Sequence, residues 1–381
     1  MDISDEQRMI QEMVRKLARN DVAPLSKKAD ISGCSSPEII RILAENGLLR
    51  MALPEQYGGI GADHTTIALV VEEMARVDAS AAMILFVTQA LIKILDQWGS
   101  EEQKERFFGK MSSGDKINAF SLTEPNYGSE SAAIQTRAVL DGDHYTVNGA
   151  KIFVTNGDIA DYVLVFVRTG EGERHKGLSA LIVEKGTRGF SVGKHEDKLG
   201  LRGSDLVELI FDDARVPSEN RIGRPGQGWE ILTTGGADMR AYGPGAMATG
   251  LAQGALDYAV NYAKQRVQFG KPIGNLQAIG FMLADMAIQV EAARSLLYRT
   301  TALMDTGVDN RTLRSRLVSA TKCFASDVAM KVTTDAVQVL GGYGVMKDYP
   351  VERMMRDAKM IQIFDGSNQI QRRIVAGTLL A

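Results

Sequence analysis

The chain has 381 residues, of which 45% are hydrophobic and 24% charged, with a formal net charge of −3 at pH 7. This composition is ordinary for a folded globular protein and excludes a disordered chain. The small net charge argues against a nucleic-acid-binding surface or a polybasic membrane patch. The local basic run "RTLRSRL" at 311–317 is interpreted as a solvated helix face.

The cysteines and histidines indicate a reducing compartment and no metal centre. Cys34 and Cys323 have no metal-ligand spacing and cannot form a disulfide framework. The four histidines are scattered singly, without an HxxxH or HExxH pattern, so no zinc or di-iron site is expected. The acidic start "MDISDEQRMI" is no signal or transit peptide, and we expect a cytoplasmic protein.

Residues 1–115 are predicted to form an N-terminal α-helical domain. "SDEQ" at 4–7 and "SEEQ" at 100–103 have capping-box spacing, and Ser36-Pro37 and Gly47 are typical of a helix start and end. The most apolar window, 79–95, contains Thr88, Gln89 and Lys93 and is shorter than the ~20 residues of a membrane span. We interpret this window as a buried helix.

The remainder divides into a β-sheet domain and a second helical domain. Residues 116–225 hold short runs rich in Val, Ile, Phe and Tyr, and Asp141-Gly142 predicts a hairpin between two of them. No long helical pattern interrupts these runs, which predicts an antiparallel sheet. Residues 226–381 return to long helical patterns, typical of a four-helix-bundle-type domain and compatible with an oligomer interface. The fold class is α+β, with no internal repeat.

Several common chemistries lack their motifs. The sequence contains no GxxxxGK[ST] loop. Its GxSxG match, "GFSVG" at 189–193, lies among the predicted strands with no helical pattern directly after it, so it is no strand-to-helix nucleophile elbow. The sequence also has no complete GxGxxG after a strand, because "GYGVMK" fails at its last glycine and follows a helix. Phosphoryl transfer, serine hydrolysis and a Rossmann dinucleotide site are therefore disfavoured.

Four stretches resemble the acyl-CoA dehydrogenases, in the same order and at similar separations. They are "FSLTEPNYGSE" (120–130), "KIFVTNG" (151–157), "RVQFGKPIGNLQ" (266–277) and "AVQVLGGYG…MRDAKMIQIFDGSNQIQ" (336–371). The resemblance implies the fold of that family, bound FAD, an acyl-CoA substrate and α,β-dehydrogenation. It also implies electron transfer to an electron-transferring flavoprotein and a homotetramer.

The resemblance also implies roles for single residues. A flat ring at Phe153, where relatives usually have Trp, can stack on a flavin, and the Arg266 guanidinium suits a pyrophosphate. Contacts from "QVLGG" often reach a neighbouring subunit in the family. The implied FAD contacts are Leu122, Thr123, Gly128, Ser129, Phe153, Thr155, Arg266, Phe269, Gln277, Gln338, Gly341, Gly342, Ser367 and Gln369; the implied substrate contacts are Ser129, Arg240 and Gly366.

Plain structural interpretations remain beside these roles. "TEPNYG" can be a β-turn, and Gly341-Gly342 can end a helix. The run "KIFVT" can be an alternating strand, with Ile152 and Val154 inward and Phe153 and Thr155 outward. The chain departs from the family at Tyr127, which replaces a small residue, and at Ala237, which replaces an acidic one.

Asp365 is the candidate catalytic base. Relatives usually place a glutamate there, or else one residue before the arginine matched by Arg240, where this chain has Met239. Replacing Glu by Asp withdraws the carboxylate by one methylene, ~1.5 Å, and a misplacement of ~1 Å can cost ~100-fold in rate. The alternative is that Asp365 is the N-cap of the final helix.

The shorter base suggests a bulkier substrate. An acyl group with a ring or branch at Cα brings more bulk to the base, and the sequence looks most like cyclohexane-1-carbonyl-CoA dehydrogenases with Asp at this position. The hypothesis is oxidation of such a substrate to the 1-ene thioester. The alternatives are a cyclic enoyl-CoA dehydrogenase with another base, for which Asp96 is the nearest candidate, a short-chain acyl-CoA dehydrogenase, or a non-catalytic flavin- or acyl-CoA-binding protein. The reaction can also run in the opposite direction, as the reduction of an enoyl-CoA to the saturated acyl-CoA.

Overall fold

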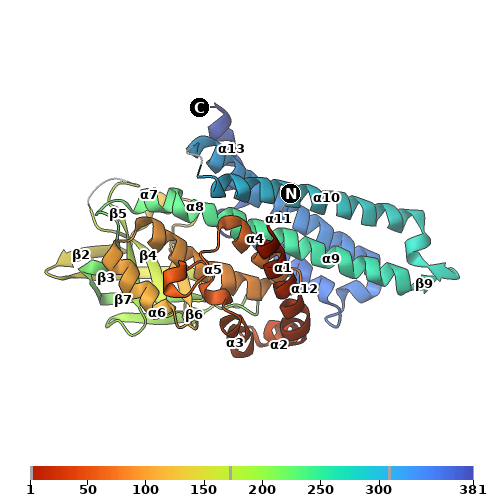
Figure 1. Ribbon diagram of the computed structural model, residues 1–381, viewed down its shortest axis with the longest axis horizontal. Coiled ribbons are helices and arrows are strands. Elements are labelled where there is room, and N and C mark those ends of the chain that lie inside the picture. The colour runs from red at the N-terminus through yellow and green to blue at the C-terminus, as the bar shows by residue number, and fades with distance from the viewer. Residues whose placement is uncertain (1–2, 171–173, 308–309, 381) are drawn as a thin grey trace.

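The computed structural model describes residues 3–170, 174–307 and 310–380. Within them, helices, a β domain and a second set of helices follow one another along the chain, as the sequence predicts. Figure 1 shows the β domain at one end of an elongated molecule and the long C-terminal helices extending to the other end.

The N-terminal helices begin where local capping chemistry predicts. The Ser4 and Ser100 hydroxyls each accept a hydrogen bond from the backbone N–H three residues on, and the side chains of Gln7 and Gln103 each accept one from the backbone N–H of the cap residue. The helices are α1 (Asp5–Leu17), α2 (Ala23–Ser32), α3 (Pro37–Glu45), α4 (His64–Ala75), α5 (Ala79–Trp98) and α6 (Glu101–Met111).

Helix α5 is long and apolar enough to cross a membrane by composition alone. However, 89% of its most apolar window is buried inside the protein. Its polar members are satisfied there, since the Gln89 amide donates to the backbone oxygens of Leu48 and Leu49. The expectation of a buried helix is confirmed.

The β domain is one twisted sheet. Its strands are β1 (Asn118–Ser121), β2 (Arg137–Asp141), β3 (His144–Thr155), β4 (Tyr162–Arg168), β5 (Leu178–Glu184), β6 (Phe190–His195), β7 (Leu206–Pro217) and β8 (Arg221–Ile222). Among the described residues the order is β6-β7-β3-β2-β4-β5-β8, with β1 beside β4. Pairing is mainly antiparallel, as predicted, and β2 and β3 form the expected hairpin at Asp141-Gly142. The exceptions are β1, which runs parallel to β4, and a single parallel bridge between β2 and β4.

Strand β3 carries a bulge that the sequence does not reveal. Its register with β7 shifts between Lys151 and Val154, and Phe153 adopts a positive φ of 56°. The ring of Phe153 is consequently 56% exposed, whereas Thr155 is buried. The alternating-strand interpretation of "KIFVT" is wrong for Thr155, because the bulge turns that side chain inward.

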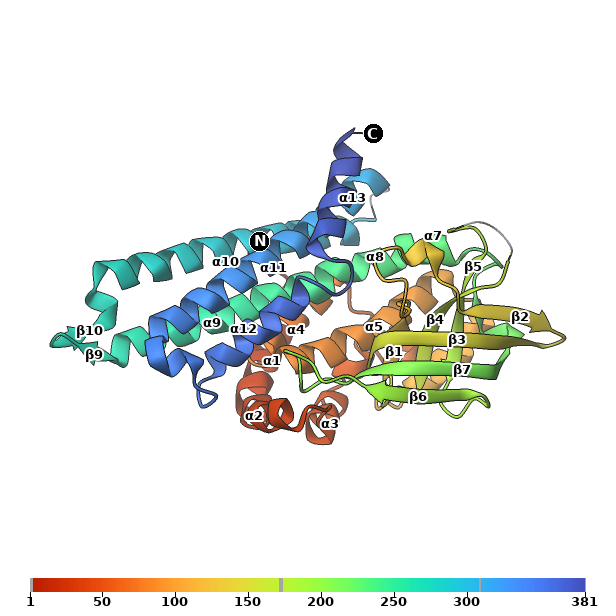
Figure 2. The same cartoon turned by 180° about the vertical axis from the view of Figure 1, so that it is seen from behind.

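The C-terminal helices pack as a bundle against α4 and α5. They are α7 (Gly228–Thr233), α8 (Gly235–Arg240), α9 (Ala246–Gln265), α10 (Gln277–Asp305), α11 (Arg311–Leu340), α12 (Pro350–Ile361) and α13 (Asn368–Leu380), with a short hairpin of β9 (Val267–Gln268) and β10 (Lys271–Pro272) between α9 and α10. Helix α11 is central and contacts α9, α10, α12 and α13. Figure 2, from behind, shows α9, α11 and α12 running side by side toward the β9–β10 hairpin.

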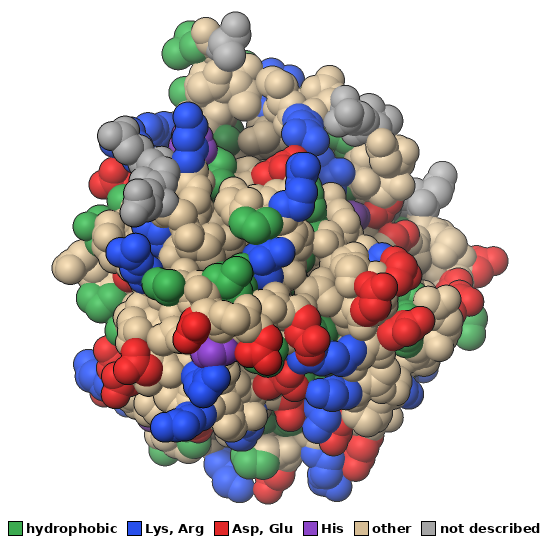
Figure 3. Space-filling view, turned by 90° about the vertical axis from the view of Figure 1, so that its left-hand side faces the viewer, with side chains coloured by type: hydrophobic (Ala, Val, Ile, Leu, Met, Phe, Trp, Pro, Cys, Tyr) green, Lys and Arg blue, Asp and Glu red, His purple; other side chains and the backbone are tan. Residues whose placement is uncertain are grey.

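The main hydrophobic core joins both helical sets to one face of the sheet, and a smaller core lies on the other face. At the end of the molecule formed by the β domain, basic and acidic side chains are interspersed over the surface (Figure 3). The site described next lies where the sheet, α5 and the bundle meet.

Candidate functional site

A cavity of about 560 Å³ lies between the β domain, α5, α7–α8 and the turn that joins α12 to α13. Residues that are far apart in the sequence meet here, because β1, β3, α8 and α12 end at this junction. The predicted site residues that line it are Leu122, Thr123, Gly128, Ser129, Phe153, Thr155, Arg240, Asp365, Gly366 and Ser367.

A second group of predicted residues lies away from this cavity. Gln369 is exposed at the start of α13. The Arg266 guanidinium lies 5.4 Å from the Tyr343 ring centroid, so the two motifs at 266–277 and 336–342 meet each other at the far end of the bundle. Phe269 is 88% exposed there. The residues of this distant group are Arg266, Phe269, Gln277, Gln338, Gly341 and Gly342; Gly341 also forms the C-cap of α11, as the helix-end interpretation predicts.

The turn carrying Asp365 is held by three side chains from other parts of the chain. Asp365 and Gly366 both have positive φ, 54° and 89°. The Asp365 carbonyl oxygen accepts hydrogen bonds from Arg240 Nε at 3.0 Å and from Gln371 Nε2 at 3.2 Å. The Gly366 carbonyl accepts from Lys322 Nζ at 2.9 Å and from Gln371 Nε2 at 3.0 Å. These hydrogen bonds stabilise the positive φ of Asp365 and Gly366, a conformation that would otherwise cost free energy at the aspartate.

Asp365 is not the N-cap of the final helix. Helix α13 begins at Asn368, and the Ser367 hydroxyl accepts from the Ile370 backbone N–H at 3.4 Å. The alternative role for Asp365 is therefore wrong. Packing within the turn itself explains the glycine at position 366, since a Cβ there would lie 2.5 Å from Gln371 Nε2.

The carboxylate of Asp365 has a buried oxygen, Oδ2, that forms no hydrogen bond among the described residues. The backbone N–H of Asp365 has no partner among them either. Burial raises the pKa of Asp365, while the nearby charges of Lys322 and Arg240 lower it. Burial also lowers the pKa of Lys322 to about 8, opposed chiefly by Asp365. A buried carboxylate with two cations beside it and no hydrogen bond is suited to exchange a proton with a molecule in the cavity.

The opposite wall is anchored by a buried ion pair. Lys151 Nζ donates to Glu124 Oε1 at 2.8 Å and to the Leu122 carbonyl oxygen at 3.0 Å. Glu124 and Tyr127 close a tight turn through two backbone hydrogen bonds of 3.1 Å each. The β-turn interpretation of this loop is thus correct, and it places Gly128 and Ser129 on the cavity. Tyr127 packs against the main core.

A third anchor holds the loop between β6 and β7. Leu201, another residue with positive φ, lines the cavity, and its backbone N–H donates to Asp357 Oδ1 on α12 at 2.6 Å. Asp357 is buried, and its burial raises the pKa of this carboxyl to about 7.

The apolar part of the wall was not predicted residue by residue. Met83 and Val87 lie one turn apart on α5, and further apolar members come from β1, α7 and α8 and from the strands, loops and helix ends around them. Helical spacing alone identifies buried residues such as these, but it does not say which of them border a cavity. The α5, β1, α7 and α8 side chains of this wall are Met83, Val87, Phe120, Leu232 and Met239. Asp96, the alternative base, is exposed at the end of α5 and is not among the described lining residues.

The sequence also missed the residues that support the site. Lys322 is a cation within the small and apolar run "LVSATKCFA" at 317–325, and this was the one available signal for it. Next to the unusual Ala237, Asp238 pairs with Arg314 on α11, with Oδ1 accepting from Nε at 2.9 Å. The Asp238 carboxylate is thereby bound by a side chain of the neighbouring helix α11.

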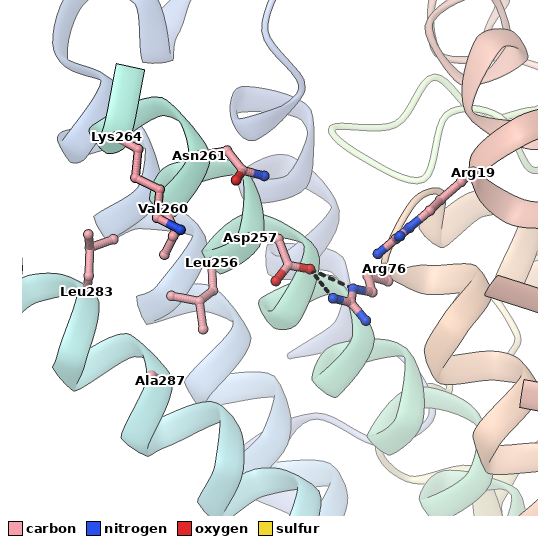
Figure 4. A pocket seen from close by; sticks show the side chains of 9 residues that line it. All are labelled: Arg19, Arg76, Leu256, Asp257, Val260, Asn261, Lys264, Leu283 and Ala287. Atoms are coloured by element: carbon pink, nitrogen blue, oxygen red, sulfur yellow. Dashed lines mark hydrogen bonds and ion pairs between the residues drawn. The ribbon is translucent and has the colours of Figure 1, made fainter. Parts of the chain in front are cut away.

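A second hollow of about 420 Å³ lies between α4, α9 and α10 (Figure 4). Arg76 extends toward Asp257 and forms an ion pair with it across one side, while Lys264 and Arg19 stand at its edge. Arg19 and Lys264 are exposed here, and Arg76 and Asp257 are half-buried and paired with each other, unlike the unpaired Asp365 Oδ2. The described residues hold no cluster of His, Cys, Asp or Glu that could bind a metal ion.

Three protein-family models match successive parts of the chain. They are those of the acyl-CoA dehydrogenase N-terminal domain (residues 4–115), middle domain (119–214) and C-terminal domain (226–380). A cyclohex-1-ene-1-carbonyl-CoA dehydrogenase of Syntrophus aciditrophicus is 44% identical over 386 aligned residues, covering 100% of this chain and 91% of the relative.

Solved structures agree with these matches. The butyryl-CoA dehydrogenase of Megasphaera elsdenii superposes with a TM-score of 0.95 at 40% identity, with 100% of both chains covered. An FAD complex of PigA gives a TM-score of 0.92 at 29% identity, covering 100% of this chain and 98% of the other.

The cavity fits the cofactor of this family. One wall presents the exposed face of Phe153 and the hydroxyls of Thr123, Ser129 and Thr155, which suit a flat, partly polar ring system. FAD is accordingly the cofactor. By its three matched domains, its full-length relatives and its fold, the chain belongs to the acyl-CoA dehydrogenase family of oxidoreductases.

Proposed function

We propose that this acyl-CoA dehydrogenase oxidises the Cα–Cβ bond of an alicyclic or α-branched acyl-CoA, with Asp365 as the base. The observation that carries the proposal is the free, buried Oδ2 of Asp365 at the cavity wall. Elsewhere among the described residues, a buried carboxylate such as Glu124 or Glu72 is engaged by a cation.

In the proposed reaction Asp365 Oδ2 accepts the α-proton of the thioester. A raised pKa makes the carboxylate a stronger base, and the charges of Lys322 and Arg240 keep it ionised. The free backbone N–H of Asp365 is a donor for the thioester carbonyl oxygen, where negative charge develops as the proton leaves. When bound, FAD supplies the acceptor for the β-hydride, and the product is the α,β-unsaturated thioester.

The choice of an alicyclic substrate rests on the short base and on the relative from Syntrophus aciditrophicus. The α5 wall offers Met83 and Val87 but no carboxylate, which disfavours a second base from the N-terminal helices. A linear short-chain substrate is the competing assignment, favoured by the likeness to butyryl-CoA dehydrogenase.

We also propose a homotetramer in the cytoplasm that passes electrons to an electron-transferring flavoprotein. Phe269, Gln277, Gln338 and the adjacent glycines are exposed and remote from the cavity of their own chain. They are available to a cofactor held in a neighbouring copy, as the family resemblance implies. This arrangement supports an assembly in which each site draws on two chains.

The test is an anaerobic titration of the purified flavoprotein, following loss of the oxidised-flavin absorbance. The ligands are cyclohexane-1-carbonyl-CoA, cyclohex-1-ene-1-carbonyl-CoA and butyryl-CoA. We expect the first to reduce the flavin fastest. Equal or faster reduction by butyryl-CoA contradicts the alicyclic assignment, and fastest reduction by the cyclohexenyl thioester supports the cyclic enoyl-CoA alternative. No reduction by any acyl-CoA contradicts dehydrogenase activity.

A further inference from the structure

One face of the α7–α8 segment forms a wall of the cavity. Gly236 and Arg240 are four residues apart on α8 and so share a face, and Leu232 near the end of α7 lines the same cavity. Arg240 contacts the Asp365 carbonyl oxygen at 3.0 Å. Gly236 therefore lies one helical turn, ~6 Å along the axis, from Arg240, the residue that contacts the Asp365 turn.

The glycine at 236 is not required by the backbone or by close packing. Its φ lies outside the positive range, and a Cβ would be 3.4 Å from Leu232 Cδ1 and 3.8 Å from Phe120 Cε2, which are ordinary contact distances. Its neighbour Gly235 differs, because a Cβ there would be 3.0 Å from Gln97 Oε1 and 3.4 Å from Ile94 Cγ1 on α5. Packing thus explains Gly235 but leaves Gly236 unexplained.

Glycine within a helix costs about 1 kcal/mol relative to alanine. At position 236 the missing side chain leaves space that opens into the cavity beside Phe120 and Leu232, both of which line it. Gly236 and Asp365 line the same cavity, and a six-membered ring is about as wide as one helical turn is long, so a ring at Cα needs space of the kind left at this position.

We propose that Gly236 determines the bulk of acyl group that the site accepts, by leaving room for a ring or branch one turn from the base. This inference rests on the proposed function and names the residue that provides its substrate specificity. A methyl group added at 236 enters the space that the ring occupies, while a linear acyl chain has more freedom to avoid it.

Binding and catalysis test the inference separately in the FAD-loaded enzyme. Benzoyl-CoA carries a six-membered ring and has no α-hydrogen, and acetyl-CoA has no β-carbon, so neither can be dehydrogenated and calorimetry measures binding alone. For Gly236→Ala we expect the benzoyl-CoA Kd to rise about tenfold and the acetyl-CoA Kd less than about threefold, since one methylene in a pocket changes discrimination by ~10–200-fold. We also expect the kcat/KM ratio of cyclohexane-1-carbonyl-CoA to butyryl-CoA to fall about tenfold.

Two further variants make the result specific. Gly109→Ala, in α6 with nothing near its would-be Cβ, is the matched control and should leave both Kd values unchanged. Adding Leu232→Val to Gly236→Ala removes the side-chain atom nearest the new methyl and should restore most of the benzoyl-CoA affinity.

An unchanged benzoyl-CoA Kd in Gly236→Ala overturns the inference, as does a variant that fails to fold or to retain FAD, because the packing argument requires that alanine fits. If benzoyl-CoA binding weakens as expected but the wild type prefers butyryl-CoA, the role of Gly236 stands and the proposed substrate is wrong. If the wild type prefers the alicyclic substrate and the variant keeps that preference, the proposed substrate stands and the role of Gly236 is wrong.

Discussion

Arg240 Nε donates a hydrogen bond to the backbone carbonyl oxygen of Asp365 at 3.0 Å, across 125 positions of the sequence. Arg240 thus positions the base turn through its backbone and leaves the carboxylate oxygen Oδ2 free. Lys322 does the same for the next residue by donating to the Gly366 carbonyl oxygen at 2.9 Å. The proposed base is held by its main chain, so its side chain remains available for chemistry.

Removing the carboxylate should abolish proton abstraction without closing the cavity. Asp365→Asn keeps the size and the backbone contacts, and we expect kcat to fall by about 10²–10⁴-fold, the usual contribution of a general base. The benzoyl-CoA Kd, measured by calorimetry, should change less than about threefold. Turnover close to that of the wild type would place the base elsewhere.

Lengthening the base should change substrate preference. Asp365→Glu restores the reach that most relatives have, at the expense of the space beside Cα. We expect the kcat/KM for butyryl-CoA to rise relative to that for cyclohexane-1-carbonyl-CoA by about tenfold, the effect of ~1 methylene in a pocket. Steady-state kinetics with both thioesters measure the ratio. A lower ratio for butyryl-CoA would contradict the argument from base length.

Lys322 is predicted to be a positioning residue for Asp365. Its Nζ also donates to Asn368 Oδ1 at 3.0 Å, so Lys322→Met frees both the turn and the start of α13. We expect kcat to fall about tenfold or more, by analogy with the cost of a misplacement of ~1 Å, and Lys322→Arg to recover part of it. Lys331→Met is the matched control, because Lys331 lies on the same helix with 54% of its side chain exposed. Equal losses in the two methionine variants would refute a specific role.

The rate should depend on pH through the same two groups. Asp365 acts as a base only when ionised, and burial raises its pKa, so kcat/KM should increase with pH through a value above that of an ordinary carboxyl. Lys322 loses its charge above its pKa of about 8, which removes a cation from beside the base and should lower the rate again. A pH profile of kcat/KM tests both limbs. In Lys322→Arg the alkaline limb should move to higher pH; an unmoved limb would assign it to another group.

The buried pair of Lys151 and Glu124 should be needed for stability and for cofactor binding. Lys151→Met leaves the Glu124 carboxylate buried without its cation and releases the Leu122 carbonyl oxygen. We expect the free energy of unfolding to fall by about 3–5 kcal/mol, as when one partner of a buried ion pair is removed. Denaturant unfolding and FAD titration provide the measurements. Adding Glu124→Gln should recover part of the loss; no recovery would show that packing, rather than the unpaired charge, was responsible.

Asp357 should make stability fall as pH rises. Its pKa is raised from 3.8 to about 7, so between these values the folded chain binds a proton that the unfolded chain does not. The free energy of unfolding should therefore decrease from about pH 4 to about pH 7, by at most ~4 kcal/mol at ~1.4 kcal/mol per pKa unit, and level off above. Asp357→Asn keeps an acceptor for the Leu201 N–H and should flatten this slope. Parallel slopes in denaturant unfolding would exclude Asp357 as the source.

Local rules predicted much of the fold, because they depend on neighbouring residues. The capping boxes at Ser4 and Ser100, the hairpin at Asp141-Gly142 and the helix end at Gly341 all form where their short motifs indicate. The order of the domains followed from hydrophobic periodicity. The parallel pairing of β1 with β4 did not, since strand partners distant in sequence leave no local signal.

By itself, the sequence determined the family, its cofactor and the single carboxylate at the position of the base, because these depend on which residues stand at motif positions. Only the tertiary structure decided the surroundings of that carboxylate. It showed that Ser367, not Asp365, caps α13 and that Arg240, Lys322 and Gln371 fix the turn; it also showed that a bulge presents Phe153 to the cavity and that Gly236 leaves space there. The Ser367 cap and the Gln371 contact are local, but the contacts of Arg240 and Lys322 join segments 125 and 44 residues apart. Burial, hydrogen-bond satisfaction and empty space exist only once those segments have packed together.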